Sequence, residues 1–566
     1  RVGTFRFSLT EENSLTINSG EFLKDSDGLK QEGFKFTVQN VGKGYGSYSV
    51  YLDDDSISSG QTRIDDKFIR YSLGINADTT GTPTNLTSRK IYSGGLDASE
   101  KDTFVLRLWL NPEVNGDIGG QVFKVKLRIE VNQQIPTPVA DKLLAGVGNN
   151  GTIDTTDPEQ TFITGTNPNN YIWYSGKLWR AVSIDPSDNS VKLVTQWNIS
   201  VLPYNADNNT AFQGSYMEQW LNDTSVDGFL GNLREPEKFI KTDSVWNATL
   251  TTATTKPEKT TMVTDAVGLL NIYEYTMSYK NATSSTGYLN NRLWWWTLTP
   301  YNTSYVRHGD SSGSDNRNRP TNSYGSRPSI NLKSAVKIID GDGTVDNPYR
   351  LQGDNDIPTG ALLSTRYSGE YISFGTGENN LYRIVSHENG TGTKITSAIP
   401  LKDSDNYKEL AFGDNVTFSK DNTIGTFLNG DYLTSGTYLT NDQVNMIEDN
   451  TTWYLGTVDI GVNYKLAKYQ DATSNSLTTT TATAKVGLQR LGELMTEQFS
   501  KADNNTSYWT LTPYSTSYVR RVNDSGDGSY NGPANSRGSR PSMNLKSTVK
   551  IVSGTGTKSS PFTISN

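Results

Sequence analysis

The chain has 566 residues, a net charge of −8 and no cysteine, and its length predicts roughly three or four domains. The acidic balance and the lack of a basic block argue against a nucleic-acid partner. The absence of cysteine excludes disulfides, thiol nucleophiles and cysteine-ligated zinc. An aromatic content of 10% is typical of globular domains.

The first residue and the distribution of apolar residues indicate where in or outside the cell the protein is found. No run of about 18 apolar residues is present, so we expect no membrane span. The chain begins at Arg1 rather than Met, as a processed protein does after its signal peptide is removed, although a trimmed chain begins in the same way. We therefore expect an extracellular or cell-surface protein.

Residues 1–135 are predicted to form an all-β domain. Apolar side chains alternate with polar ones over Phe123–Val131 and again over Phe104–Leu110, which is the period of a half-buried strand. The same alternation places Phe5, Phe7 and Leu9 on one face at the start of the chain. Several strands without helical periodicity favour a β-sandwich or jelly roll.

The end of this domain carries a family resemblance. The segments Leu106–Leu110, Asn115–Gly120 and Phe123–Leu127 resemble the TasA/camelysin group of secreted matrix proteins. The resemblance covers the first domain alone. It implies a jelly-roll fold and assembly into fibres, and it brings no catalytic residues.

Residues 136–159 are expected to be a linker, because Pro136 and Pro138 are followed by a stretch rich in Gly, Asn, Thr and Asp. Within it, Val139 to Ala145 has the spacing of one short helix. The chain after this linker is duplicated. Trp296 to Tyr349 and Trp509 to Phe562 align without a gap, and well over half of their paired positions are identical.

The duplication predicts two homologous α+β domains, at 160–352 and 358–566. Both contain Trp-Thr-Leu-Thr-Pro, starting at Trp296 and Trp509, and both end on Arg-Pro-Ser-x-Asn-Leu, starting at Arg327 and Arg540. These motifs resemble a domain of unknown function in Firmicute surface proteins. That family is distantly similar to the C-type-lectin-like fold, which implies a lectin-like architecture and leaves activity open.

The two copies differ most between Arg307 and Gly325 and over the equivalent stretch of the second copy. Constant length with changing side chains predicts a surface loop on a fixed scaffold. In that interpretation His308 is a solvated loop residue rather than a catalytic base. Eight residues here are candidate ligand-binding positions: Tyr305, Arg307, His308, Asp310, Tyr518, Arg520, Arg521 and Asn523.

The shared polar residues have two interpretations. Arg307, Arg327 and Asn331 recur in the second copy as Arg520, Arg540 and Asn544. They form either a carbohydrate or anion site or, as we favour, a set of side chains that hold loop carbonyls and carboxylates. The acidic residues Asp340 and Asp342 suggest calcium, but the second copy lacks both, so we expect a glycine turn and no metal or other cofactor.

These observations predict a protein that is not an enzyme. The favoured function is a structural subunit of an extracellular filament, which assembles head to tail with copies of itself. Phe5, Phe7 and Leu9 form the candidate donor strand, pairing either within their own sandwich or in a neighbour's sheet. The alternative is a lectin-like adhesin that binds glycans through the variable loops.

Overall fold

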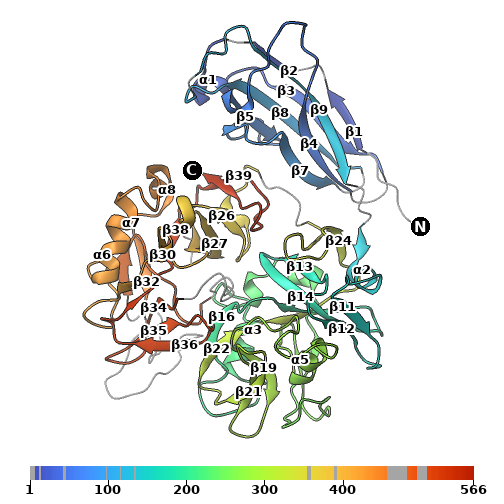
Figure 1. Ribbon diagram of the computed structural model, residues 1–566, viewed down its shortest axis with the longest axis vertical. Coiled ribbons are helices and arrows are strands. Elements are labelled where there is room, and N and C mark those ends of the chain that lie inside the picture. The colour runs from blue at the N-terminus through green and yellow to red at the C-terminus, as the bar shows by residue number, and fades with distance from the viewer. Residues whose placement is uncertain are drawn as a thin grey trace.

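The computed structural model describes residues 7–11, 15–18, 20–42, 46–96, 99–114, 116–132, 136–353, 359–387, 392–455, 481–493 and 506–566. This part of the chain is mostly β-structure, arranged in many separate sheets. An N-terminal unit lies above two further units that stand side by side (Figure 1). Buried apolar residues form three large clusters that coincide with the three units. Among the described helices, none is long and apolar enough to cross a bilayer.

The N-terminal unit consists of two antiparallel sheets over one core. Their strand orders are β1-β3-β8-β5-β6 and β2-β9-β4-β7, and Phe36 and Phe104 of the first sheet share a core with Val50 and Val125 of the second. The elements are β1 Phe7–Glu11, β2 Leu15–Asn18, α1 Asp25–Gly28, β3 Phe34–Asn40, β4 Gly46–Asp54, β5 Ile69–Ile75, β6 Thr84–Asn85, β7 Lys90–Leu96, β8 Lys101–Leu110 and β9 Val122–Asn132.

The candidate donor strand lies at the edge of the first sheet. Strand β1 pairs antiparallel with β3, and Leu9 stands opposite Val38. In this structure the segment therefore pairs within its own sheet, which is one of the two arrangements that the sequence left open. Phe5 lies outside the described residues.

The first repeated unit contains a large mixed sheet and a second, five-stranded sheet of order β16-β22-β19-β20-β21. Its elements are β10 Thr137–Pro138, α2 Val139–Leu144, β11 Gly151–Asp154, β12 Thr161–Gly165, β13 Tyr171–Tyr174, β14 Lys177–Ile184, β15 Val191–Thr195, β16 Ser200–Pro203, α3 Tyr216–Asn222, α4 Pro236–Phe239, β17 Ser244–Asn247, β18 Met262–Asp265, α5 Ile272–Ser278, β19 Trp295–Pro300, β20 Val306–Gly309, β21 Asp315–Asn318, β22 Ser323–Ser326, β23 Ser329–Leu332, β24 Lys337–Asp340 and β25 Tyr349–Leu351.

Residues 136–159 are part of this unit, so their prediction as a linker was wrong. Strand β10 pairs with β24, and β11 pairs with β12. The predicted short helix is present as α2, and it buries Val139 and Leu143 in the core of the first repeat. Proline and polar composition suggested a linker, but the few apolar residues of this stretch are enough to dock it.

The second repeated unit has a core of its own and, from β13 onward, repeats most of the elements of the first in the same order. Its elements are β26 Tyr371–Ser373, β27 Leu381–Ser386, β28 Thr393–Ser397, β29 Lys402–Asp403, β30 Asn406–Tyr407, β31 Leu410–Ala411, α6 Thr423–Asn429, α7 Asp431–Thr434, α8 Asn441–Met446, β32 Thr451–Tyr454, β33 Thr481–Ala484, β34 Tyr508–Pro513, β35 Val519–Val522, β36 Gly528–Asn531, β37 Ser536–Arg537, β38 Ser542–Leu545, β39 Lys550–Ser553 and β40 Thr563–Ser565.

Irregular features repeat as well as regular ones. The pairing of β19 with β20 shifts register between Trp296 and Pro300, and that of β34 with β35 shifts between Trp509 and Pro513. Trp296 and Trp509 are both fully buried, as the duplication predicts. Matching bulges at matching residues indicate that the two units share one fold.

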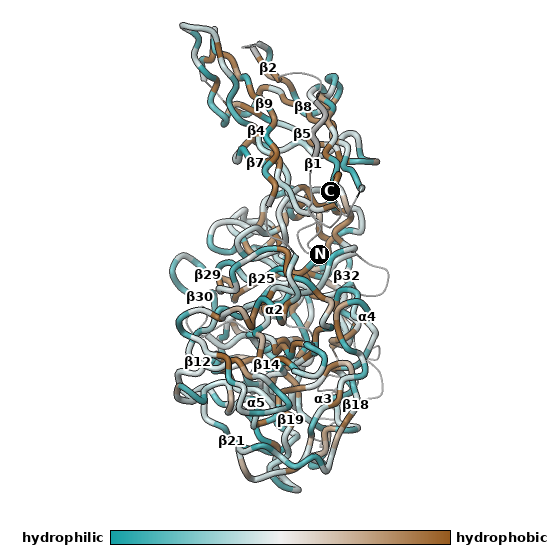
Figure 2. Tube along the Cα trace, turned by 90° about the vertical axis from the view of Figure 1, so that its right-hand side faces the viewer, coloured by the Kyte–Doolittle hydropathy of each residue, from teal (hydrophilic) through white to brown (hydrophobic). Residues whose placement is uncertain are grey.

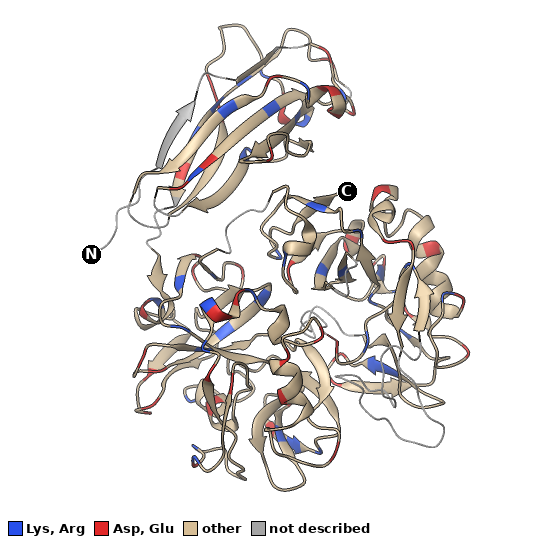
Figure 3. Cartoon of the chain, turned by 180° about the vertical axis from the view of Figure 1, so that it is seen from behind, with Lys and Arg blue, Asp and Glu red and all other residues tan. Residues whose placement is uncertain are grey.

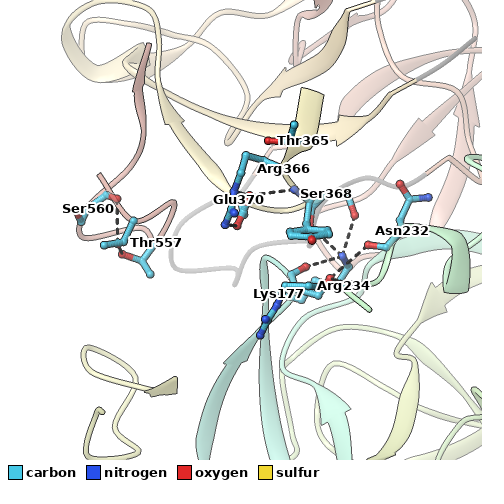
Figure 4. Close-up of polar contacts among 12 residues, drawn as sticks. Lys177, Asn232, Arg234, Thr365, Arg366, Ser368, Glu370, Thr557 and Ser560 are labelled. Atoms are coloured by element: carbon cyan, nitrogen blue, oxygen red, sulfur yellow. Dashed lines mark hydrogen bonds and ion pairs between the residues drawn. The ribbon is translucent and has the colours of Figure 1, made fainter. Parts of the chain in front are cut away.

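The two repeats are joined by a buried polar and apolar interface. Lys177 is the first residue of β14, and its Nζ donates to the carbonyl oxygen and the Oγ of Ser368 in the second repeat at 2.9 and 2.8 Å (Figure 4). Elsewhere, Val201 of the first repeat clusters with Leu491 and Tyr508 of the second. Because Lys177 is only 2% exposed, these bonds are shielded from water and hold the units together.

Polarity follows this arrangement. Apolar stretches run along the strands and inside the units, while turns are hydrophilic (Figure 2). Lys and Arg are interspersed with Asp and Glu over all three units, without a large region of one sign (Figure 3).

Candidate functional site

Each repeat buries a lysine and a glutamate as a direct ion pair. In the first repeat Lys192 of β15 pairs with Glu274 of α5, and the glutamate side chain is 3% exposed. In the second repeat Lys394 Nζ lies 2.5 Å from Glu493 Oε1, and both side chains are almost fully buried. Buried charges are costly unless they are paired, so the preservation of this pair in both repeats identifies the strongest candidate site.

Local backbone structure fixes the glutamate. Asn271 caps helix α5, and its N–H donates to Glu274 Oε2 at 3.0 Å in a capping box. Gln160 also donates to Glu274, at 3.0 Å. In the second repeat the N–H of Arg490 donates to Glu493 Oε2 at 3.0 Å. Each carboxylate therefore presents one oxygen to the lysine, while the backbone holds the other.

A tryptophan covers the lysine in both repeats. The Nζ of Lys192 lies 4.9 Å from the ring centre of Trp246, and that of Lys394 lies 5.2 Å from Trp453. Each tryptophan rests on a glycine: a Cβ at Gly268 or Gly487 would come within 2.3 or 2.6 Å of the indole. The glycines are thus required for the ring to approach the strand.

An asparagine stands directly opposite the lysine. Strand β15 pairs with β23 so that Lys192 faces Asn331, and β28 pairs with β38 so that Lys394 faces Asn544. Residues directly opposite one another on antiparallel strands project from the same face of the sheet. Asn544 is 3% exposed, and its Oδ1 has no hydrogen-bond partner among the described residues, which is rare for a buried polar atom.

The surroundings of the cluster differ between the repeats. In the first repeat it lies beside a cleft of about 540 Å³. One wall is held by Asp157, which accepts hydrogen bonds from Lys256 at 2.8 Å and from Tyr273 at 2.9 Å. The Lys192 side chain is 11% exposed, whereas the Lys394 side chain is 3% exposed. The lysine is therefore more accessible to solvent in the first repeat than in the second.

Two of the predicted ligand-binding residues, Arg307 and His308, are buried in strand β20, which lies between β19 and β21. Tyr305 and Asp310 flank this strand and are half-buried. The prediction of a surface loop between Arg307 and Gly325 was wrong, because most of this stretch forms strands β20, β21 and β22 joined by short turns.

His308 is not a solvated residue. Its ring stacks on Trp294 with centroids 5.1 Å apart and meets the edge of Tyr324 at 4.7 Å. Burial lowers the pKa of His308, since the charged form loses its hydration. The aromatic surroundings favour a neutral packing role in the first repeat, and the equivalent position in the second repeat is Arg521.

The structural interpretation of the shared arginines is confirmed. Arg327 donates to the carbonyl oxygens of Thr195 and Leu289 at 3.0 and 2.7 Å. Arg540 donates to the carbonyl oxygen of Ser397 at 2.9 Å. Arg307 likewise donates to two loop carbonyls and to the carboxylate of Asp315.

In the second repeat the predicted residues lie beside an exposed aromatic group, which we call the tyrosine platform: Tyr514, Tyr518 and Tyr530. The rings of Tyr514 and Tyr530 are stacked 4.0 Å apart, and Arg520 lies 4.4 Å from the centre of Tyr514. Tyr518 and Tyr530 are each 43% exposed. Arg521 donates to Asn523, and both are half-buried. Because Arg521 stands opposite Ser529 rather than Tyr530, its side chain projects from the other face of the strand pair.

The candidate calcium loop is a turn. Asp342 Oδ1 accepts from the backbone and the hydroxyl of Thr344, at 3.0 and 2.7 Å, and Asp340 pairs with Arg350. Gly341 and Gly343 have positive φ, as do Gly554 and Gly556 in the second copy, which glycine tolerates best. The described part of the chain contains no group of three or more side chains suited to a metal ion.

Comparison with known proteins does not assign the chain to a family. No protein-family model matches the chain. A search of curated proteins also finds no match. The functional argument therefore rests on the geometry of the described residues.

Proposed function

We propose that the protein is a secreted structural subunit of an extracellular filament. In this proposal the N-terminal unit is a jelly-roll assembly domain that polymerises head to tail. The two repeats are C-type-lectin-like domains displayed on the filament surface. Their interface, with the buried Lys177 and Ser368 contact, supports display of the pair as one body.

The position of strand β1 carries the proposal. Among the described residues it is the first strand, it lies at the edge of its sheet, and β3 is the one strand that pairs with it. Main-chain hydrogen bonds do not depend on which chain supplies the strand, so the same segment of a second copy fits the same place. Each subunit would then donate one strand and accept another, a contact that does not close and that generates filaments.

A cysteine pair tests the exchange. Leu9 and Val38 stand opposite one another, and the natural chain has no cysteine to interfere. Cysteines at directly opposite strand positions are close enough to form a disulfide. If β1 is exchanged, a Leu9→Cys and Val38→Cys chain assembled into filaments gives a covalent ladder on a denaturing gel, which collapses on reduction.

The matched control joins β3 to β8, which no exchange separates. Thr37 and Thr103 are also register partners, so Thr37→Cys with Thr103→Cys must stay monomeric on the same gel. Disulfides confined to single chains in both variants, in material that still forms filaments under the electron microscope, would rule out strand exchange. If the unaltered protein forms no filaments under any condition tested, the proposed function itself fails.

The tyrosine platform favours a second function, glycan binding by a surface adhesin. Exposed aromatic rings present an electron-rich face to the C–H groups of a sugar ring. Loss of glycan-array binding in Tyr530→Ala would support this function. The control is Arg317→Ala, because Arg317 occupies the equivalent position in the first repeat and packs on Tyr301. An unaltered array profile in Tyr530→Ala would dismiss the platform.

A further inference from the structure

We propose that each repeat forms an internal amide cross-link, in which the lysine of the buried cluster condenses with the asparagine opposite it. The bonds would join Lys192 to Asn331 and Lys394 to Asn544, with Glu274 and Glu493 as the proton-transfer groups. This modification is independent of filament assembly and of glycan binding.

The selection of residues supports a reaction rather than an ion pair alone. A buried ion pair requires a lysine and a glutamate, whereas a cross-link also requires an amide on the strand that faces the lysine. That amide is present in both repeats at the same register position. Neighbouring polar positions have changed, since Asn271 of the first repeat is Arg490 in the second.

Strand geometry brings the reacting groups within reach. Directly opposite residues of antiparallel strands have Cβ atoms about 4.5–5.5 Å apart. The four-carbon stem of lysine spans this gap when it bends back over the sheet. The tryptophan above the lysine confines the stem, and the contact of Lys394 Nζ with Glu493 Oε1 at 2.5 Å places a proton acceptor on the amine.

The reaction balances without an oxidant or a cofactor. The glutamate takes one proton from the lysine ammonium, and the free Nζ lone pair attacks the asparagine Cγ. The glutamic acid then protonates Nδ2 and takes a second proton from Nζ while the Cγ–Nδ2 bond breaks. Ammonia leaves, an Nζ–Cγ amide remains, and the proton left on the glutamate passes to solvent.

The unpartnered oxygen of Asn544 fits this chemistry. Its Oδ1 is buried without a hydrogen-bond donor among the described residues. Once Glu493 has taken the lysine proton, its O–H becomes a donor beside the amide. A hydrogen bond from that O–H to Oδ1 would polarise the carbonyl for attack. The reacting state would therefore give Oδ1 the hydrogen-bond donor that it lacks among the described residues.

Intact mass spectrometry of the full chain tests the proposal. We expect a mass lower than the sequence mass by two molecules of ammonia. Lys192→Arg and Lys394→Arg should each restore one. Lys241→Arg is the matched control, because Lys241 lines the same cleft but pairs with Asp188 at 2.6 Å, and its mass deficit should equal that of the unaltered chain.

Tandem mass spectrometry of proteolytic fragments removes the main ambiguity. Cyclisation of an asparagine to a succinimide loses the same mass, but only a cross-link yields a branched peptide that contains both Lys394 and Asn544. Glu493→Gln keeps both reacting groups and should leave that bond unformed.

The unaltered chain decides the matter even if variants fail to fold. A folded, fully aged chain at its sequence mass overturns the proposal. A single ammonia loss that persists in Lys192→Arg and vanishes in Lys394→Arg supports the bond in the second repeat and overturns it for the first.

Discussion

Replacement of Trp509 by alanine should be among the most damaging single changes in the second repeat. The indole is 1% exposed, its Nε1 donates to the carbonyl oxygen of Leu410 at 2.9 Å, and its ring meets Phe412 edge to face at 5.7 Å. Truncation removes the ring contacts, leaves a cavity and strands a buried carbonyl. Substitutions of this kind lower the free energy of unfolding by about 3–5 kcal/mol.

Urea unfolding of the full chain measures this loss as a shift of its lowest transition. Tyr530→Ala is the control, because it removes an aromatic ring that is 43% exposed from strand β36 of the same sheet. Exposed substitutions usually change the free energy of unfolding by no more than about 0.5 kcal/mol. If Trp509→Ala costs no more than Tyr530→Ala, the tryptophan is not a core residue and the assignment of two homologous cores is refuted.

Three further changes test the interface and the buried titratable groups. Lys177→Met leaves the carbonyl oxygens of Ser175 and Ser368 without their donor; it should cost about 1–3 kcal/mol and speed amide exchange across the interface in hydrogen-exchange experiments. Burial lowers the pKa of His308, so its neutral form stabilises the fold above the ordinary histidine pKa. That stabilisation is lost as the pH falls below the ordinary pKa. In calorimetry, His308→Phe should therefore make the unfolding temperature depend less on pH between pH 7 and pH 5. Burial and the nearby Glu218 raise the pKa of Asp265 to about 7. The stability that its protonated form contributes is present at low pH and is lost as the pH rises through that value. Asp265→Asn should therefore raise the unfolding temperature at pH 8 and change it little at pH 4.

Repetition was the most informative signal in the sequence. Because Trp296 and Trp509 recur in one motif, their burial in equivalent cores could be predicted without a structure, and it is confirmed. The shared Arg327 and Arg540 likewise bind loop carbonyls. Positions that both copies retain are those whose environment the fold dictates, so agreement between copies substitutes for knowledge of the contacts.

Composition was misleading where partners lie far away in the chain. The segment after His308 is rich in Gly, Ser, Asn and Asp, which is typical of loops. Its strands form because β20 pairs with β19, which lies beside β22 in the same five-stranded sheet, and β19 and β22 flank or carry the aromatic partners of His308. The local sequence does not indicate which distant strands will pair with a segment in the fold.

Lys192 was missed for a related reason. Alternation in the segment Val191-Lys192-Leu193 suggests that the lysine faces solvent. Strand β15, however, is enclosed by β14 and β23 on its edges and by Trp246 on its face. A signal was nevertheless present, since a lysine occupies the same place in Val191–Thr195 and in Thr393–Ser397, and surface lysines have no reason to persist between copies whose loops have diverged.

The two repeats have kept one interior and acquired different surfaces. In the first, Arg317 packs on Tyr301 and a cleft reaches the Lys192 cluster. In the second, Tyr530 takes the place of that arginine and stacks on Tyr514, and the Lys394 side chain is only 3% exposed. The proposed cross-link depends on residues that both repeats retain. The proposed glycan binding depends on surface residues that differ between them.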